Sequence, residues 1–542
     1  MQMTIDRRDV LKSLAGLTAS SVVVTGAGTA AVAQSRSETL RHVLGSHFSS
    51  LDPTLQGSTR ESSPLSVNIY DRLASFERKK DARGYTFDFD NIRGELAERI
   101  DRSSDGLTYT FHIRQGATWH DGTPVEAEDV KWSLDRGVTA NSLSKPQLAN
   151  GSIVKEEQIS IVGDRQVQVT VDRPDRLALA VVSVPTVPMF NSKLAKRHAT
   201  SDDPWAINWL KDNTAAGGAY TVESNRPGQQ IVLRRNDKWK NGKDGTLPHF
   251  QRIIAQTVPD VSARASLVER GDADLTLDAA TSDIIGIEQR GRARVLPIPL
   301  SNAFQAIGFN TQKAPFNDVR IRRAIAAALP YEAMFKVALF ERGERLFGAN
   351  WTEPTEARLL QAMPNRTDLD RAKALLAEAG VANGFKTTFS FAASAAPLNE
   401  PMAALIKESL AKVGVEVTVQ KLPEAQYVTM ILERKLDMYF EFATSWFPNA
   451  EYVIRTFFMG NGRWNSSAWD DATIVKLAEE ARFEVDPAAY NRKVLEIVKR
   501  LNEQTPVALV WQPSHDAVVA RDVEDYTYWF HRGADYRDLR RA

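Results

Sequence analysis

The clearest structural pattern in the chain is GELAERIDRSSDGLTYTFHIRQGATWHDGTPVEAEDVKWSLDR, residues 94–136. Apolar and polar residues alternate from Leu107 to Arg114, which predicts a strand with one buried face. Thr123, Pro124 and Glu126 then predict a helix start, with a side-chain cap, a proline at the first helical position and a reciprocal carboxylate. With the Asp105-Gly106 pair as a turn, the stretch therefore predicts a strand, a turn, a second strand, a loop and a helix in succession.

Three segments of this stretch resemble the signature of the family 5 extracellular solute-binding proteins, the dipeptide and oligopeptide receptors of ABC importers. They are ELAERI, SDGLTYTFHIRQGATWHDGTP and AEDVKWSL. The resemblance continues in GGAYTV (217–222), GDADL (271–275), FNTQKAPFNDVRIRRAIAAAL (309–329) and RAKALLAEAG (371–380). It implies an α/β fold of the two-lobed periplasmic binding protein type, with mixed sheets flanked by helices and an extra subdomain in the first lobe.

The predicted domain organisation follows from this resemblance and from changes in hydrophobic pattern along the chain. The parts are a leader (1–33), lobe I (34–300) with an inserted subdomain (about 75–200), lobe II (301–505) and a C-terminal return to lobe I (506–542). We expect the first crossing between the lobes at 297–309, where two prolines precede an apolar run.

The N-terminus predicts export from the cytoplasm. Arg7 and Arg8 precede a mildly apolar run and resemble the twin-arginine export signal. Ala31 and Ala33 form a small-residue cleavage site before Gln34, so we expect cleavage after Ala33 and a periplasmic location. The alternative is a membrane anchor, but the run is shorter than about 20 strongly apolar residues and contains several Ser, Thr and Gly.

Composition excludes several functional classes. The chain has 68 basic and 68 acidic residues without a long charge run, which argues against nucleic acid and membrane-surface partners. It has no cysteine, which excludes disulfides, thiolate metal sites and a lipid-attachment cysteine. The eight histidines include no HExxH motif, and there is no G-x-S-x-G serine and no Walker loop. We therefore expect no catalytic residue, no metal and no cofactor.

The leading site candidate is a loop that follows a predicted central strand, Asp437–Ala443. Ligands of open α/β sheets bind outside the carboxyl ends of strands, so Trp446, Phe447 and Asn449 are candidate ligand contacts. Other tryptophans in predicted loops or at strand ends could form an apolar wall; they are Trp351, Trp464 and Trp511. By resemblance, the end of the first strand faces the cleft, which adds His47 and Phe48.

Asn449 marks a departure from the family pattern. In the peptide receptors that this chain resembles, the tryptophan of this loop is followed three residues later by an aspartate that pairs with the peptide α-ammonium. The amide at Asn449 removes that charge, so free dipeptides are disfavoured unless Glu441, Glu451 or another acid replaces it. A neutral, hydroxyl-rich or N-blocked ligand suits an amide beside tryptophans.

The predicted function is that of a monomeric receptor that closes on a small polar ligand and presents it to an ABC permease. A peptide or peptide-like compound is the first expectation, and an oligosaccharide or a modified amino-acid conjugate is the alternative. A secreted hydrolase on the same architecture is a second alternative, and it would need a nucleophile with a base or a metal cluster. An export chaperone that binds many unrelated chains weakly is a third.

Overall fold

We describe the protein from a computed structural model, in which the described residues are 36–59, 61–80, 84–240, 245–277, 279–460, 462–529 and 533–542. The predicted export signal, with Arg7, Arg8, Ala31 and Ala33, lies outside the described residues. Among the described helices, none is both long enough and apolar enough to cross a membrane.

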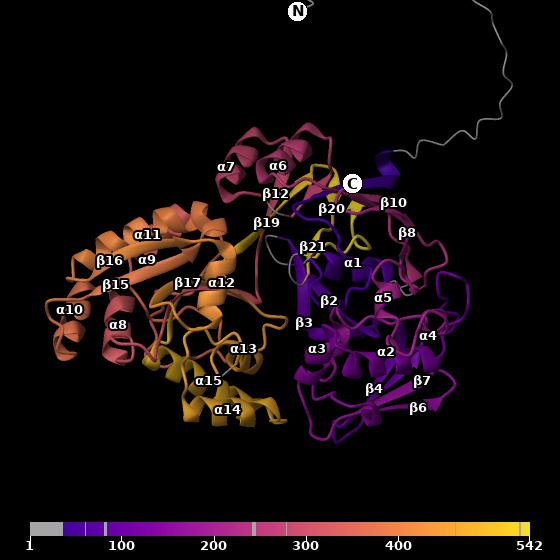
Figure 1. Cartoon of the computed structure of the whole chain (residues 1–542), viewed down its shortest axis with the longest axis horizontal. Helices are drawn as coiled ribbons and strands as arrows, with labels where there is room; N and C mark the ends of the chain where they lie inside the picture. The colour runs from indigo at the N-terminus through magenta and orange to yellow at the C-terminus, as the bar shows by residue number, and fades with distance from the viewer. Residues whose placement is uncertain are drawn as a thin grey trace, which may run out of the picture. The chain divides into compact units, whose positions relative to one another are not determined.

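One sheet contains both early strands and late strands of the chain (Figure 1). Its order is β12 (Ala293–Pro299), β19 (Ser514–Ala520), β11 (Leu275–Thr276), β1 (Thr39–Leu44), β10 (Arg252–Thr257), β9 (Gln230–Arg235) and β8 (Tyr220–Arg226). β1 is parallel to β10 and β11, whereas β19 is antiparallel to β11 and β12, so the sheet is mixed. We call the part of the chain built on this sheet the first lobe, residues 36–299 and 514–542.

A second sheet is formed by the middle of the chain. Its order is β14 (Glu344–Arg345), β18 (Val507–Gln512), β13 (Ala303–Phe309), β17 (Met438–Thr444), β15 (Lys386–Ala392) and β16 (Glu416–Leu422). The parallel strands β15 and β16 are joined through α11 (Ala396–Ala411), as a crossover connection requires. We call this part the second lobe, residues 303–512.

Helices cover both faces of the second sheet, which explains why β13 and β18 are buried along their whole length. One core contains side chains from α8 (Val319–Ala328), α9 (Tyr331–Leu339), α10 (Leu369–Glu378) and α11. The other contains side chains from α13 (Ala450–Phe457), α14 (Ala472–Arg482) and α15 (Pro487–Gln504). α12 (Glu424–Leu432) contributes Tyr427 to a smaller cluster beside β17.

The stretch from 94 to 136 forms part of a subdomain of the first lobe. Its sheet has the order β4 (Ala97–Arg102), β5 (Thr108–Ile113), β7 (Gln166–Thr170) and β6 (Ile159–Gly163), and α2 (Ala127–Thr139) shares its core. The predicted strand is therefore present, but the helix begins later than predicted. Glu126 is the cap, in a capping box with Asp129. Thr123 instead donates its hydroxyl to Asp121 at 2.6 Å, and Pro124 forms a bridge with Thr118.

The first lobe contains further helices and strands outside its large sheet and its subdomain sheet. They are α1 (Ser62–Ile69), β2 (Ala74–Lys80), β3 (Tyr85–Gly94), α3 (Ser144–Asn150), α4 (Ser192–Lys196), α5 (Ile207–Leu210), α6 (Val261–Arg270), α7 (Thr281–Arg290), β20 (Val523–Glu524), β21 (Thr527–Tyr528) and β22 (Arg540–Arg541). β21 extends the β2–β3 pair to three strands, which places the C-terminal segment against the first lobe.

The chain passes between the lobes twice. The first passage, Leu300–Asn302, lies between β12 and β13 and falls inside the predicted range of 297–309. The second lies at Pro513, between β18 and β19. The expectation that the return to the first lobe begins at residue 506 is therefore wrong, because β18 pairs with β13 and β14 in the second sheet. The apolar sequence of β18 would suit either sheet, and only its strand pairing shows that it belongs to the second.

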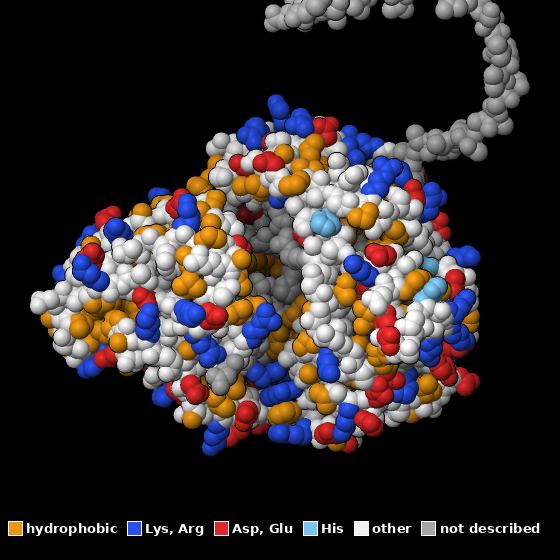
Figure 2. Space-filling model, in the orientation of Figure 1, with side chains coloured by type: hydrophobic (Ala, Val, Ile, Leu, Met, Phe, Trp, Pro, Cys, Tyr) orange, Lys and Arg blue, Asp and Glu red, His pale blue; other side chains and the backbone are white. Residues whose placement is uncertain are grey.

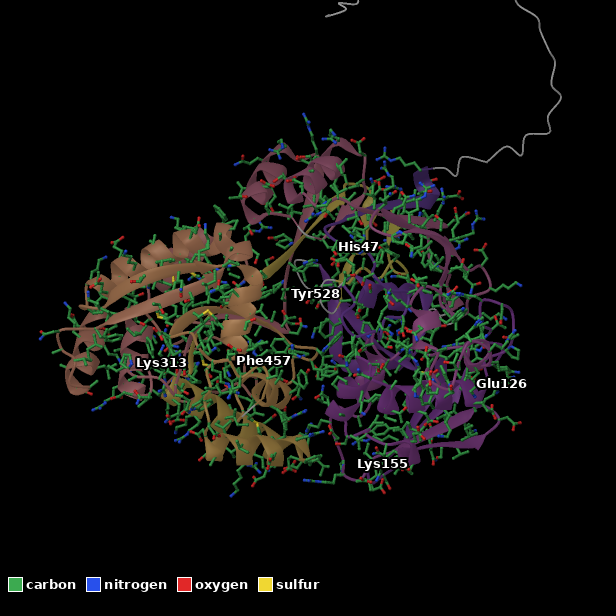
Figure 3. All side chains as sticks on the ribbon, in the orientation of Figure 1. His47, Glu126, Lys155, Lys313, Phe457 and Tyr528 are labelled. Carbon is green, nitrogen blue, oxygen red and sulfur yellow. The ribbon has the colours of Figure 1, made fainter. Side chains whose placement is uncertain are left out.

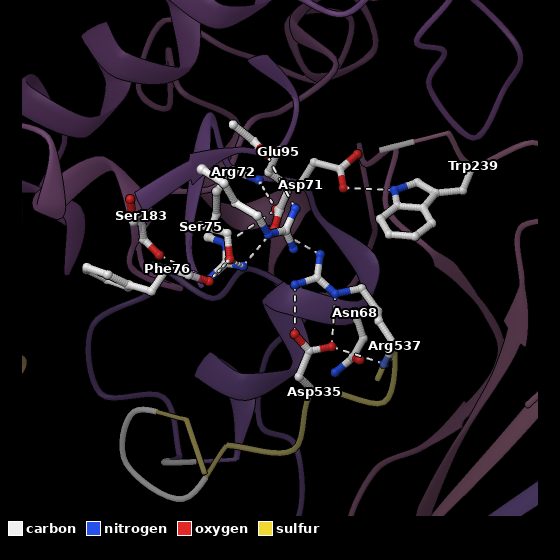
Figure 4. A network of polar contacts seen from close by, with 12 residues as sticks. Asn68, Asp71, Arg72, Ser75, Phe76, Glu95, Ser183, Trp239, Asp535 and Arg537 are labelled. Carbon is white, nitrogen blue, oxygen red and sulfur yellow. Dashed lines mark hydrogen bonds and ion pairs between the residues drawn. The ribbon is translucent and has the colours of Figure 1, made fainter. Parts of the chain in front are cut away.

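A buried ion network attaches the C-terminal segment to the first lobe (Figure 4). The Glu95 carboxylate accepts from Arg72 at 2.8 Å and from Arg537 at 3.0 Å, and Arg537 also pairs with Asp535 at 2.7 Å. Burial acts to raise the pKa of Glu95, but Arg537 and Arg72 override it and lower the pKa to about 2. Since all these groups are buried and paired, removing one would leave the others with uncompensated charge.

Candidate functional site

The loop after β17 extends from the second lobe onto the first. Ser445 donates its backbone N–H and its hydroxyl to the carbonyl of Asn302, at 2.8 and 2.9 Å. Phe447 is fully buried in the core of the first lobe, with its ring centroid 5.8 Å from that of Phe89 on β3. Trp446 is partly buried against the same core. The predicted site loop therefore lies where the two lobes meet.

Asn449 has a structural role in this loop. It caps α13 by accepting from the backbone N–H of Tyr452 at 3.0 Å, and its amide donates to the hydroxyl of Tyr490 at 3.1 Å. An asparagine amide has two N–H donors and two acceptor lone pairs, so one N–H and one lone pair remain for a ligand. The amide of Asn449 therefore holds the start of α13 and the hydroxyl of Tyr490 in position.

A cavity of about 740 Å³ lies beside Asn449 and is lined by both lobes. Figure 2 shows the surface hollowed between the lobes. The first lobe supplies residues of β2 and β3, of the subdomain edge and of the segment 174–180. The residues from the second lobe are Ala357, Arg358, Leu360, Pro448, Asn449, Ala450, Glu484, Val485 and Tyr490. Ser301 and Gln512, at the two passages between lobes, complete the lining. The volume falls in the range of about 300–1,000 Å³ that small-molecule sites occupy.

Aromatic rings form the apolar part of the cavity. Phe87 and Phe89 come from β3, Tyr109 from β5 and Tyr490 from α15. Phe87, Tyr109 and Tyr490 are largely buried, which fixes their positions. These rings can cover apolar parts of a ligand or stack on a planar group.

Charged side chains surround these rings. The cationic ones are Lys79, Arg102, Arg176 and Arg358, and the anionic ones are Asp90, Asp175 and Glu484. Glu484 accepts from Lys493 at 2.6 Å, and this hydrogen bond lowers the pKa of Glu484. Asp90 is exposed on β3. The cavity therefore has a polar, mainly cationic rim around an aromatic wall.

Arg482, at the end of α14, forms the most extensive contact across the edge of the cavity. Its guanidinium donates to Asp175 at 2.9 Å, to the carbonyls of Ala149 and Asn150 at 3.1 and 3.2 Å, and to the hydroxyl of Ser152 at 3.1 Å. Asp175 has a side-chain exposure of 0%. The two carbonyls lie at the C-terminus of α3, where a cation is favoured. We call Arg482 with these four partners the arginine clasp.

Further contacts reinforce the clasp. Arg455, paired with Glu451 at 2.7 Å, donates to the side chain of Asn150 at 3.0 Å. Arg173 lies over the ring of Phe483 at 3.6 Å. The first and second lobes are thus held together here by arginine side chains, and Arg482 binds both side chains and backbone carbonyls of the first lobe.

The other predicted contacts do not line this cavity. Trp351 donates its indole N–H to the carbonyl of Ala362 at 2.9 Å and lines a separate cavity in the second lobe. Trp464 is half exposed, with Arg463 over its ring. Trp511 is fully buried in a core of the second lobe and donates to Gln305. Phe48 is buried in the core of the first lobe.

His47 is exposed on the first lobe and does not line the cavity (Figure 3). A contact between His47 and a ligand therefore stays a prediction. The two acids that could replace the missing aspartate do not line the cavity. Glu451 is buried and pairs with Arg455. Glu441 is buried and accepts from Ser466 at 3.0 Å, and burial raises its pKa to about 7.

The two lobes, the two chain passages and the cavity at the boundary are the architecture of the periplasmic binding protein fold. Residues 91–465 match the family described as "Bacterial extracellular solute-binding proteins, family 5 Middle", so the chain belongs to that family. The chain is 25% identical over 466 residues to "Probable D,D-dipeptide-binding periplasmic protein DdpA" of Escherichia coli K12, covering 85% of this chain and 86% of that protein.

Two further comparisons agree with this assignment. The chain is 26% identical over 434 residues to "Glutathione-binding protein GsiB" of Pectobacterium atrosepticum, covering 78% of this chain and 75% of that protein. The solved structure of the periplasmic binding protein DppA from Helicobacter pylori, in complex with the peptide STSA, has the same fold. Its TM-score is 0.72 at 21% identity, and the match covers 93% of this chain and 98% of that one.

Proposed function

We propose that this protein is a periplasmic receptor that captures a peptide or peptide-like compound between its lobes and delivers it to an ABC importer. The observation that carries the proposal is the cavity of about 740 Å³ lined by both lobes. Relatives named for a D,D-dipeptide and for glutathione support a ligand of this size and class. The matched relatives are named as binding proteins, which favours a receptor over a secreted hydrolase.

Closure of the lobes is the step that a permease would recognise. A ligand can shift the equilibrium only by its differential affinity for the closed state. The ligand that fills the cavity contacts both lobes, whereas in an open state it would contact one. Micromolar to nanomolar affinity corresponds to about 8–12 kcal/mol, enough to bias an equilibrium separated by a few kcal/mol.

The ligand class is tested by measuring binding directly. Mass spectrometry of compounds that copurify with the protein, followed by calorimetry with a dipeptide set and an oligosaccharide set, separates the alternatives. An Asn449→Asp variant tests the missing aspartate, and since Asp is also a good helix cap, its stability should be unchanged. Tight binding of free dipeptides by the unmodified protein would show that the aspartate is not needed.

Small-angle scattering tests the closing motion and the monomeric state together. The proposal requires a monomer that becomes more compact when a saturating ligand is added. Product formation from peptides or glycosides would instead support a hydrolase. Weak binding of many unrelated chains would support the chaperone alternative.

Export through the twin-arginine route is part of the proposal. Arg7 and Arg8 should direct the precursor, and Ala31 and Ala33 should set the cleavage site. Replacing both arginines with lysine should leave precursor in the cytoplasm. Normal export of that variant would contradict the route without affecting the binding function.

A further inference from the structure

We propose that the cavity binds a carboxylate group of the ligand between Arg102 and Arg176, and that the receptor therefore selects ligands with a free carboxylate. This inference rests on the proposed receptor function and adds a chemical requirement to it. It depends on which charged groups of the cavity are already paired within the protein, on how the arginines are held and on how many N–H donors remain.

Two of the three cavity carboxylates are already satisfied. Asp175 accepts from Arg482 at 2.9 Å, from the hydroxyl of Ser152 at 2.7 Å and from the backbone N–H of Leu177 at 2.9 Å. Glu484 accepts from Lys493 at 2.6 Å. Neither carboxylate therefore neutralises the arginines that face the cavity.

Two of the cavity arginines have no such partner. Arg102 and Arg176 make no ion pair with any residue that the structure describes. Each is instead positioned by an aromatic ring of the cavity wall: Arg102 lies over Tyr109 at 5.6 Å from the ring centre, and Arg176 over Tyr490 at 4.1 Å. Lys79 and Arg358 differ, since Lys79 lies 3.7 Å from Asp88 and Arg358 lies 2.5 Å from Glu356.

The N–H groups that remain on these arginines can donate to a negatively charged oxygen group. A guanidinium has five N–H groups in one plane. Arg176 uses its Nε to donate to the carbonyl of Glu484 at 2.9 Å, which leaves its terminal N–H groups for a ligand. A ring beneath the guanidinium does not compete with these in-plane donors, and paired in-plane N–H groups bind a carboxylate in a bidentate manner. Of the cavity groups without an ion pair among the described residues, Asp90 offsets only one of the two arginines, so a ligand carboxylate at this position would balance the remaining positive charge.

The two arginines come from separate parts of the first lobe. Arg102 ends β4 of the subdomain, and Arg176 lies on the segment that also carries Asp175 of the arginine clasp. The ring under Arg176 belongs to the second lobe, so this stacking requires the two lobes to be in contact. Ligand charge and lobe closure are thereby connected at one residue.

The test uses two peptide pools that differ only at the C-terminus. The purified protein is incubated with di- and tripeptides with a free carboxylate, and separately with the matched C-terminal amides. We expect retention of acids, with affinities about 10- to 100-fold above those of the amides, as for hydrogen bonds to a charged group. The Arg102→Gln and Arg176→Gln variants should each reduce this ratio, and the double variant should abolish it.

Arg99→Gln is the matched control, because Arg99 lies on the same strand as Arg102, pairs with Asp101 at 3.1 Å and does not line the cavity. It should keep the full acid-to-amide ratio. Equal affinity for acids and amides, or equal losses in the control and the cavity variants, would overturn the carboxylate site. Competition by inorganic phosphate but not by acetate would also overturn it, in favour of a phosphate site. Retention of neither pool would overturn the peptide receptor function itself.

Discussion

The lobes meet in two regions, and only one of them contains the chain passages. At the chain passages, Leu300 donates its N–H to the carbonyl of Pro513 at 3.0 Å, and Tyr528 donates to the side chain of Asn302 at 3.0 Å. Arg342 of the second lobe also pairs there with Asp516 of the first lobe at 2.8 Å. At the other edge, the arginine clasp holds the lobes through the ion pair of Arg482 with Asp175 and through hydrogen bonds from Arg482 to backbone carbonyls of α3. The first region has covalent connections and buried apolar packing, so it suits a permanent pivot, whereas the second can separate without breaking any core. We therefore expect the stability of the closed state to depend on the clasp and on the ligand.

The largest expected effect is at the pivot. Phe447→Ala should lower the free energy of unfolding by about 3–5 kcal/mol, because a fully buried ring that connects the lobes would leave a cavity. Phe442→Ala is the control, since this ring lies on β17, just before the loop, and is 46% exposed. Its effect should stay within about 0.5 kcal/mol. Urea unfolding measures both, and equal losses would contradict the assignment of Phe447 as the packing anchor.

Glu441 offers a pH test in β17, the strand that leads to the pivot loop. Its folded pKa of about 7 exceeds the unfolded value, so the native state binds more protons between these two values. Stability should therefore fall as the pH rises from about 4.5 to 7, by up to about 3 kcal/mol in total.

The Glu441→Gln variant should remove this loss, because Gln keeps an acceptor for Ser466 without a charge. At pH 8 the variant should be more stable than the unmodified protein, and at pH 4.5 the difference should vanish. Chemical unfolding at both pH values measures this. A variant that is less stable at pH 8 would indicate that the carboxylate is ionised and well paired in the native state.

Removing the clasp arginine should have a smaller effect, and it should change lobe closure without lowering the free energy of unfolding of either lobe. In the Arg482→Gln variant the buried Asp175 loses its counter-charge, so the closed state should lose about 1–3 kcal/mol. Small-angle scattering should show a more open average state without ligand, and the effect of the substitution should decrease with added salt because the contact is ionic. Arg320→Gln is the control, since Arg320 pairs with Asp318 within the second lobe. Unchanged dimensions in both variants would exclude the clasp as a closing contact.

The smallest effect is expected from a single stacking contact beside the clasp. Arg173→Gln removes the guanidinium that lies 3.6 Å from the ring centre of Phe483, and exposed cation–π contacts contribute about 0.5–1 kcal/mol. Ligand affinity should therefore change by less than about tenfold, as calorimetry would measure. A larger loss of ligand affinity in Arg173→Gln than in Arg482→Gln would indicate that the contact with the Phe483 ring, and not the ion pair, is the main closing contact.

The fold could be predicted from sequence because its signals are local. Alternation from Leu107 to Arg114 marks β5, and the apolar run before the Trp446 loop marks β17. The start of α2 could not be fixed, because Thr123 and Glu126 both have the chemistry of a cap and only the bridge of Pro124 with Thr118 decides between them.

The cavity could be predicted only in part. Asn449 was identified from the loop after a central strand, and it does line the cavity. Arg102, Arg176 and Tyr490 were missed, because they meet through the approach of two lobes and no short motif marks them. Trp511 shows the converse difficulty: a tryptophan at a strand end can point into a core when helices cover both faces of its sheet.

The position of β19 has a consequence for synthesis of the chain. β19 lies between β12 and β11, and Arg541 pairs with Asp274 at 3.1 Å, so the first lobe needs residues that follow the second lobe in the chain. The second lobe is one continuous segment and can fold as it leaves the ribosome, whereas the first lobe must wait for the last residues to be released. A ribosome-bound or C-terminally truncated chain should therefore contain a folded second lobe beside an incomplete, protease-sensitive first lobe.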